Sequence, residues 1–150
     1  MSAPQADLLE RAGLAKPKRK SQRSKACDDL DLQIRSHQIA GFVREHKFAM
    51  CEGRAYRFDF ANKALRLAVE VEGIVVLNLD GRRICTGRHM TPDGFREDCI
   101  KYALAIELNW YVLRVEQSMI RSDLAIELLY RCIYAIQERQ RLAQTAREDA

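Results

Sequence analysis

The sequence predicts an α/β protein of the α+β kind, in which a four-stranded mixed sheet is flanked by helices in the order αβββαβα. Two adjacent segments, 54–61 and 64–77, alternate apolar and polar side chains with the period of two that β-strands show. Helical patterns lie on both sides of them. The pattern over 92–108 is long enough for a crossover between parallel strands. The 150 residues suffice for one domain with its own core.

Composition narrows the class of protein. Hydrophobic residues make up 47% and charged residues 31% of the chain, as in ordinary soluble domains. No apolar run approaches the roughly 20 residues of a membrane span, and the N-terminus lacks the apolar core of a secretory signal. We therefore expect a cytoplasmic protein without a membrane partner, in the host cytoplasm if the gene belongs to a phage. The five cysteines include no CxxC pair, which argues against a zinc site and a disulfide framework.

Positive charge is concentrated near the N-terminus. The net charge is +4, and residues 16–25 carry six basic side chains and no acid. We divide the chain into a flexible basic arm, 1–26, and a folded domain, 27–150. Two interpretations of the arm stay open: a tether that adds contacts to nucleic-acid phosphates, and a solvated or localisation-like tail. The candidate DNA-binding residues of the arm are Lys16, Lys18, Arg19, Lys20, Arg23 and Lys25.

The first elements of the folded domain are a helix and three strands. An imperfect apolar stripe predicts a helix over 28–45, which Gly41 weakens. A short first strand over 47–50 follows. With the segments 54–61 and 64–77 it makes a meander, whose strands pair antiparallel.

The later elements follow a polar loop over 78–92. Thr91 suits the N-cap of the helix 92–108, whose side predicted to be buried consists of Phe95, Cys99, Tyr102, Ala103 and Ile106. A short buried strand over 110–115 comes next. An amphipathic helix over 122–141 then ends the domain, and the residues beyond it are expected to fray.

Three carboxylates lie within the apolar strands. Alternation sets Glu70 and Glu72 on one polar face, and Asp59 points away from the phenylalanines that flank it. Buried carboxylates are costly unless a metal ion or a partner charge compensates them. Mg²⁺ prefers oxygen ligands, so Asp59 and Glu70, with the backbone carbonyl of Val71, form a candidate metal site. The alternative for the two glutamates is the wet face of an edge strand.

The metal-site hypothesis sets a condition on the connection between the two strands. A tight turn at Asn62 and Lys63 would place Asp59 opposite Arg66, and Glu70 would then lie roughly 13 Å further along the strand. A looser connection across 61–67 is needed to bring Asp59 and Glu70 level.

Five short motifs occur in a characteristic order: RFDFA, LAVEVEG, GRH, GFREDCIKY and WYVLRV. In these motifs and their spacing, the sequence resembles the small endonuclease-like proteins of phages and bacteria in the PD-(D/E)xK superfamily. These are relatives of the very short patch repair endonuclease. The resemblance covers about residues 45–120.

The resemblance implies a restriction-endonuclease-like core and DNA cleavage that depends on Mg²⁺ or Mn²⁺. It makes Asp59 the motif aspartate and Glu70 the motif glutamate. The usual lysine, two residues after the glutamate, is Glu72 here, as is common among the small relatives. An upstream glutamate also occurs in the relatives, and both Glu45 and Glu52 are candidates for it.

Two residues are candidates for the proton transfer that the missing lysine would assist. His89 lies in the polar loop, and histidine titrates near neutral pH. Lys101, with Asp98 three residues before it, lies on the predicted crossover helix. It can replace the strand lysine if that face of the helix meets the acidic edge of the sheet. The alternatives are an exposed loop histidine and an ordinary surface ion pair.

The segment 74–85 is longer than the matching stretch of most relatives. Its two arginines and a third one just after it either contact phosphate or lie in a solvated loop. These residues are Arg82, Arg83 and Arg88. The leading hypothesis is a metal-dependent DNA endonuclease or nicking enzyme. The alternatives are a DNA-binding module that kept the nuclease fold without turnover, and a structural protein that forms a homodimer through its C-terminal helix.

Overall fold

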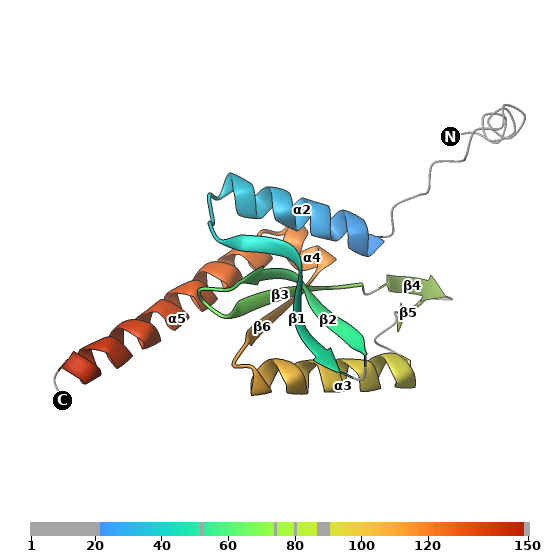
Figure 1. The fold of residues 1–150 in the computed structure, drawn as a ribbon. Helices are drawn as coiled ribbons and strands as arrows, with labels where there is room; N and C mark the ends of the chain where they lie inside the picture. The colour runs from blue at the N-terminus through green and yellow to red at the C-terminus, as the bar shows by residue number, and fades with distance from the viewer. Residues whose placement is uncertain (1–21, 52, 74, 80, 87–90, 149–150) are drawn as a thin grey trace, which may run out of the picture.

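The computed structural model describes residues 22–51, 53–73, 75–79, 81–86 and 91–148. Figure 1 shows their arrangement around one central sheet. In chain order, the elements are α2 (Gln22–Ser36), β1 (Phe42–Cys51), β2 (Arg54–Asn62), β3 (Leu67–Glu72), β4 (Val75–Leu79), β5 (Arg82–Thr86), α3 (Pro92–Glu107), β6 (Tyr111–Glu116), α4 (Gln117–Arg121) and α5 (Leu124–Glu148).

The central sheet has four strands in the order β1-β2-β3-β6. The meander β1-β2-β3 is antiparallel, and β6 pairs with β3 in parallel from Leu67 opposite Tyr111 to Glu72 opposite Glu116. Helix α3 makes the crossover between these parallel strands, as parallel pairing requires. The expected four-stranded mixed sheet flanked by helices is thereby confirmed.

Two hydrophobic clusters cover the two faces of this sheet. The larger one packs α2, α4 and α5 against β3 and β6, and its largest fully buried side chains include Phe60, Leu30 and Leu129. The smaller one lies under α3 and joins Phe58, Ala61, Ala68, Ala105 and Trp110. Ala68 lies between Leu67 and Val69 of the larger cluster, so the strand alternation places the two clusters on opposite faces.

The helix predicted over 28–45 is wrong at both ends. Helix α2 begins at Gln22, and the buried Ala26 lies in the larger core, so the folded part begins before the predicted boundary at residue 27. The helix ends at Ser36, and the chain turns into β1 through Gly41, whose φ is +85°. A side chain at Gly41 would meet the Asn62 amide at 2.7 Å, so this turn needs glycine.

The third strand and the polar loop also differ from expectation. The segment 64–77 divides into β3, which ends at Glu72, and β4. Strand β4 pairs antiparallel with β5 around Gly81. The predicted loop over 78–92 therefore contains a strand. Figure 1 shows this hairpin projecting beyond the end of β3. The signal overlooked in the sequence is the dipeptide Asp80-Gly81, which is typical of two-residue hairpin connections.

Helix α3 occupies the predicted residues, but the side that meets the sheet is rotated by one residue, about 100°, from the predicted side. Phe95 and Ile106 are exposed, while Asp98 and Ala105 are buried. The side of α3 that meets the sheet carries Lys101, which pairs with Glu70, and Ala105, which packs in the smaller hydrophobic cluster. An apolar stripe was thus mistaken for the buried side.

The C-terminal helix is longer and interrupted. A short helix, α4, precedes it, and α5 continues to Glu148, beyond the predicted end at 141. Among the apolar residues from which we predict this amphipathic helix, Ile136 is buried, Leu128 and Ile133 are half-buried, and Leu124 is exposed. None of the described helices combines the length and the apolar composition needed to cross a bilayer.

The N-cap of α3 provides a first testable prediction. The Thr91 hydroxyl accepts a hydrogen bond from the Gly94 N–H at 3.1 Å. Replacing Thr91 by alanine is expected to lower the free energy of unfolding by about 1 kcal/mol, because an N–H at the start of the helix loses its acceptor. Urea denaturation measures the change. Thr91→Ser keeps the acceptor and should stay near wild type; an equal loss in both variants would contradict the cap.

Candidate active site

Asp59 and Glu70 lie on neighbouring strands, just beyond the last residue pair of the β2–β3 ladder. The ladder ends at the pair of Phe60 with Val69, and Asp59 and Glu70 are the next residue on each strand. The turn that allows this is wide: Leu65 N–H donates to Asn62 Oδ1 at 3.1 Å, and Arg66 takes a φ of +51°. The loose connection that the metal-site hypothesis requires is therefore present.

Asp59 is buried at the point where the β2–β3 ladder ends. Its Oδ2 accepts a hydrogen bond from the Val71 N–H at 2.8 Å, in place of a backbone acceptor. The N–H and C=O of one strand residue point toward the same neighbour, so the Val71 carbonyl faces the same side of β3 as Asp59. Two carboxylates and a carbonyl, all hard oxygen donors, thus approach one edge of β3.

Glu70 forms an ion pair with Lys101 across the space between β3 and α3. Lys101 Nζ lies 2.7 Å from Glu70 Oε1, and the two side chains are only 14% and 5% exposed. The same ammonium lies 5.6 Å from the centre of the Phe58 ring. The predicted meeting of Lys101 with the acidic edge of the sheet is thus present, and the interpretation of Lys101 as part of an ordinary surface ion pair is wrong.

Glu72 has a different environment. It accepts hydrogen bonds from Arg114 Nε at 2.6 Å and from the Tyr102 hydroxyl at 3.4 Å. Arg114 also lies 4.0 Å from the buried Asp98. The hydrogen bond to Glu72 raises the pKa of Arg114, and burial, followed by the charges of Glu70 and Glu72, raises that of Tyr102. Glu72 is therefore held by β6 and α3.

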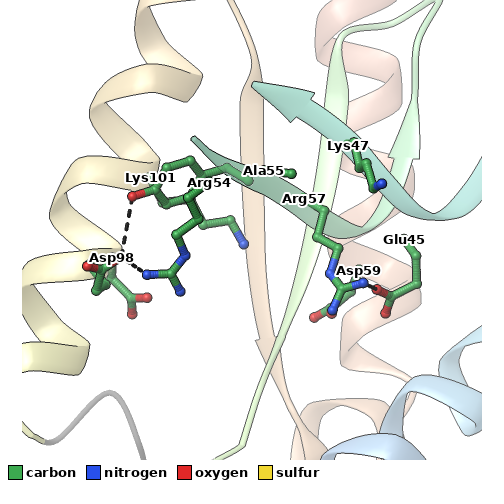
Figure 2. A pocket seen from close by; sticks show the side chains of 10 residues that line it. Glu45, Lys47, Arg54, Ala55, Arg57, Asp59, Asp98 and Lys101 are labelled. Carbon is green, nitrogen blue, oxygen red and sulfur yellow. Dashed lines mark hydrogen bonds and ion pairs between the residues drawn. The ribbon is translucent and has the colours of Figure 1, made fainter. Parts of the chain in front are cut away.

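A cleft of about 390 Å³ opens beside these residues, between β1, β2 and α3. Figure 2 shows Asp59 on one side of it and Lys101 with Asp98 on the other. Its lining consists of Glu45, Lys47, Arg54, Ala55, Tyr56, Arg57, Asp59, Glu97, Asp98 and Lys101. Charged side chains thus dominate the wall of the cleft, as expected for a site that binds ions rather than apolar ligands.

Several cleft residues were missed by sequence reasoning. Lys47, Arg54 and Arg57 line the same cleft as Asp59. A signal for Arg57 was present, because it precedes Asp59 by two residues on a predicted strand and shares its side by alternation. No such signal existed for Glu97, which reaches the cleft from α3.

Other predicted site residues fall outside the site or outside the described residues. Of the two upstream glutamates, Glu45 lines the cleft. Arg82 is exposed on β5, and Arg83 belongs to the same strand. Arg23 and Lys25 belong to α2. The described residues do not include Glu52, Arg88, His89, Lys16, Lys18, Arg19 or Lys20.

Fold and site together define an α+β protein with a buried pair of carboxylates and a lysine beside a charged cleft. Comparisons with protein-family models, with curated proteins and with solved structures gave no match. Within the described ranges, no group of three or more His, Cys, Asp or Glu side chains has a geometry ready to hold a metal ion. The resemblance to the PD-(D/E)xK superfamily therefore stays a prediction.

Proposed function

We propose that the protein is a DNA endonuclease that depends on Mg²⁺ or Mn²⁺ and has a restriction-endonuclease-like core. The observation that carries this proposal is that Asp59 and Glu70 are both buried on neighbouring strands where the β2–β3 ladder ends, with Lys101 paired to Glu70. Two carboxylates beside a cleft whose wall includes four cationic side chains suit a negatively charged substrate held next to a divalent ion.

The donor set fits such an ion. Asp59, Glu70 and the Val71 carbonyl would hold it, since these are the hard oxygen ligands that Mg²⁺ takes alongside water and phosphate. When bound, the ion would stabilise negative charge on the phosphate and lower the pKa of a water. Fewer than three protein carboxylates suffice for Mg²⁺, which usually keeps several waters.

Lys101 takes the role that the strand lysine has in the superfamily. Its ammonium, 2.7 Å from Glu70, orients that carboxylate and can donate a proton or a hydrogen bond to an oxygen in the cleft. Phe58, fully buried beneath the ammonium, keeps water from that side of it. Glu72, bonded to Arg114, keeps a neighbouring positive charge in place. His89 stays a second candidate for proton transfer.

A DNA-binding module without turnover is the second candidate, and one observation favours it. Glu70 already has a short ion pair with Lys101, so its charge is compensated without a metal ion. In addition, Glu72 stands where the superfamily has its lysine.

Plasmid cleavage separates the two candidates. Supercoiled plasmid is incubated with the protein in Mg²⁺, in Mn²⁺ and in EDTA, and open-circular and linear products are quantified. An endonuclease gives products with metal and none with EDTA. Binding of the plasmid without products in either metal would establish the module without turnover and reject the endonuclease.

A further inference from the structure

One wall of the cleft carries three cations, Arg54, Arg57 and Lys47, for which the proposed metal site has no role. We propose that Arg54, Arg57 and Lys47, on β1 and β2, bind phosphates of the polynucleotide backbone, and that Glu45 and Glu97 occupy the two arginines until the phosphates replace them. This inference rests on the proposed function only for its ligand, DNA. The binding experiment below does not require cleavage.

Arg57 is placed to contact a phosphate close to Asp59. Its guanidinium lies 3.1 Å from Glu45 Oε2 and is 61% exposed, so a ligand can reach it. Figure 2 shows this pair directly beside Asp59. Glu45 has a φ of +52°, a backbone conformation that is uncommon for a non-glycine residue. The backbone of β1 is therefore distorted where it brings Glu45 to the cleft.

Arg54 is held in a similar way from α3. Its guanidinium bonds to Glu97 Oε2 at 2.5 Å, and the same oxygen accepts a hydrogen bond from the Tyr56 hydroxyl at 3.3 Å. Arg54 is 52% exposed. Lys47, exposed on β1, lines the same cleft as the two arginines and Asp59. Guanidinium groups bind phosphate oxygens in two places at once, which suits them to this role.

The balance of charges gives the proposal its distinctive consequence. The cleft is lined by four cations and four carboxylates, so its net formal charge is zero. Phosphates must therefore compete with Glu45 and Glu97 for the arginines. Removing the charge of either glutamate should strengthen DNA binding, whereas removing an arginine should weaken it.

Fluorescence anisotropy of a labelled DNA duplex of about 20 base pairs tests this in EDTA, where a metal-dependent enzyme cannot cut. Arg57→Ala and Arg54→Ala should weaken binding at least threefold and lower the slope of log affinity against log salt by about 0.9 each. Glu45→Gln and Glu97→Gln should tighten binding by a similar factor, about threefold.

A matched ion pair away from the cleft controls for net charge. Glu138 and Arg141 on α5 form a 3.0 Å pair with 38% and 62% exposed side chains. Arg141→Ala and Glu138→Gln change the net charge identically and should leave affinity within twofold. Equal effects at both pairs, weaker binding by Glu45→Gln, or no binding by wild type would each overturn the proposal. Normal cleavage without weaker binding by the arginine variants and tighter binding by the glutamate variants would reject only the phosphate-binding role of the cleft. These changes in binding without any cleavage would reject only the nuclease function.

A second, independent feature is the apolar outer face of α3. Phe95 and Ile106 are 65% and 74% exposed, and Cys99 and Ala103 between them are also exposed. The spacings of four, four and three residues place all four on one side of the helix. Figure 1 shows no described element on the side of α3 away from the sheet. Clustered exposed apolar side chains mark interaction surfaces.

We infer that this stripe binds a second copy of the same chain, with the two α3 helices antiparallel. In that arrangement Phe95 meets Ile106 of the second copy, and the small Cys99 and Ala103 lie at the crossing, where the helices approach closely. Arg96 and Glu107 are exposed on the same flank of the stripe. Antiparallel pairing brings each Arg96 next to a Glu107, so the surface is complementary to itself in charge as well.

The dimer should be weak. Sixteen helical residues extend about 24 Å, and one helix pair of this length buries less than the 1,200 Å² or so of stable complexes. Sedimentation velocity should detect dimer at about 100 μM protein, at which a micromolar complex is populated. Ile106→Glu and Arg96→Glu should give monomer, and the double variant Arg96→Glu with Glu107→Arg should restore the dimer.

Leu142→Glu is the matched control, because Leu142 is 58% exposed on α5. It should dimerise like wild type. A monomeric wild type, or a dimer unaffected by Ile106→Glu, would overturn the inference. Loss of dimer in Leu142→Glu alone would instead place the interface on the C-terminal helix.

Discussion

Replacing Asp59 by asparagine is expected to lower metal-dependent plasmid cleavage at least 100-fold. The variant keeps an oxygen that can accept the 2.8 Å hydrogen bond from the Val71 N–H, so the local fold is retained. It removes the negative charge that a divalent ion requires. Stabilisation of charge by a metal ion is worth several kcal/mol, and 100-fold corresponds to about 2.7 kcal/mol. Initial rates of nicking in Mg²⁺ measure the effect.

Thermal unfolding is the companion measurement for this variant. The midpoint of Asp59→Asn should stay close to wild type, which separates loss of the charge from loss of the fold. Asp93→Asn, at an exposed aspartate in the first turn of α3, is the matched control and should cut like wild type. Cleavage that persists in Asp59→Asn would place the reaction elsewhere or assign it to a contaminant.

Replacing Lys101 by methionine is expected to lower the free energy of unfolding by about 3 kcal/mol at pH 7, because it leaves a buried carboxylate without its cation. Glu70 is only 5% exposed, so water cannot compensate its charge. The double variant Glu70→Leu with Lys101→Met removes both charges and should recover most of the loss. Urea denaturation of the wild type, both single variants and the double variant gives the free energies of unfolding for a double-mutant cycle.

The exposed pair on α5 again supplies the comparison. Arg141→Ala, which breaks an ion pair between side chains 62% and 38% exposed, should change stability by less than about 0.5 kcal/mol. A comparably small effect of Lys101→Met would mean that Glu70 finds another cation or water, and would remove the electrostatic reason for the orientation of α3.

The candidate site could be predicted from the sequence where its residues share a strand or adjoining strands. Glu70 and Glu72 are on one side of β3 by alternation, and both bond to residues of α3. The partners themselves could not be predicted. The sequence left two roles open for Lys101, a site residue or part of a surface ion pair. Arg114, which pairs with Glu72, belongs to β6, which reaches β3 only through the crossover helix. Arg54 and Arg57 were overlooked because their glutamate partners come from α3 and from a distorted turn of β1.

The fold, too, could be predicted from the sequence only where it depends on local properties of the chain. The segments 54–61 and 92–108 lie within one residue of β2 and α3, because strand alternation and the Thr91 cap are local properties. The prediction of a helix over 28–45 was wrong beyond Ser36. Near Gly41 a helical stripe and an amphipathic strand share too many apolar spacings to be told apart. The β4–β5 hairpin was missed although the dipeptide Asp80-Gly81 between its two segments is a sequence signal for a hairpin turn.

The sequence by itself determined the chain order of the four strands of the central sheet and of the helices beside them, and the side of β3 on which its acids lie. Backbone propensity and side-chain periodicity act over a few residues, so the chain carries them locally. Only the tertiary structure decided which side of α3 meets the sheet. The apolar stripe of Phe95 and Ile106 favoured one side, yet the helix turns its polar side inward. A buried Glu70 needs a cation, and the side of α3 that meets the sheet carries Lys101, which supplies it.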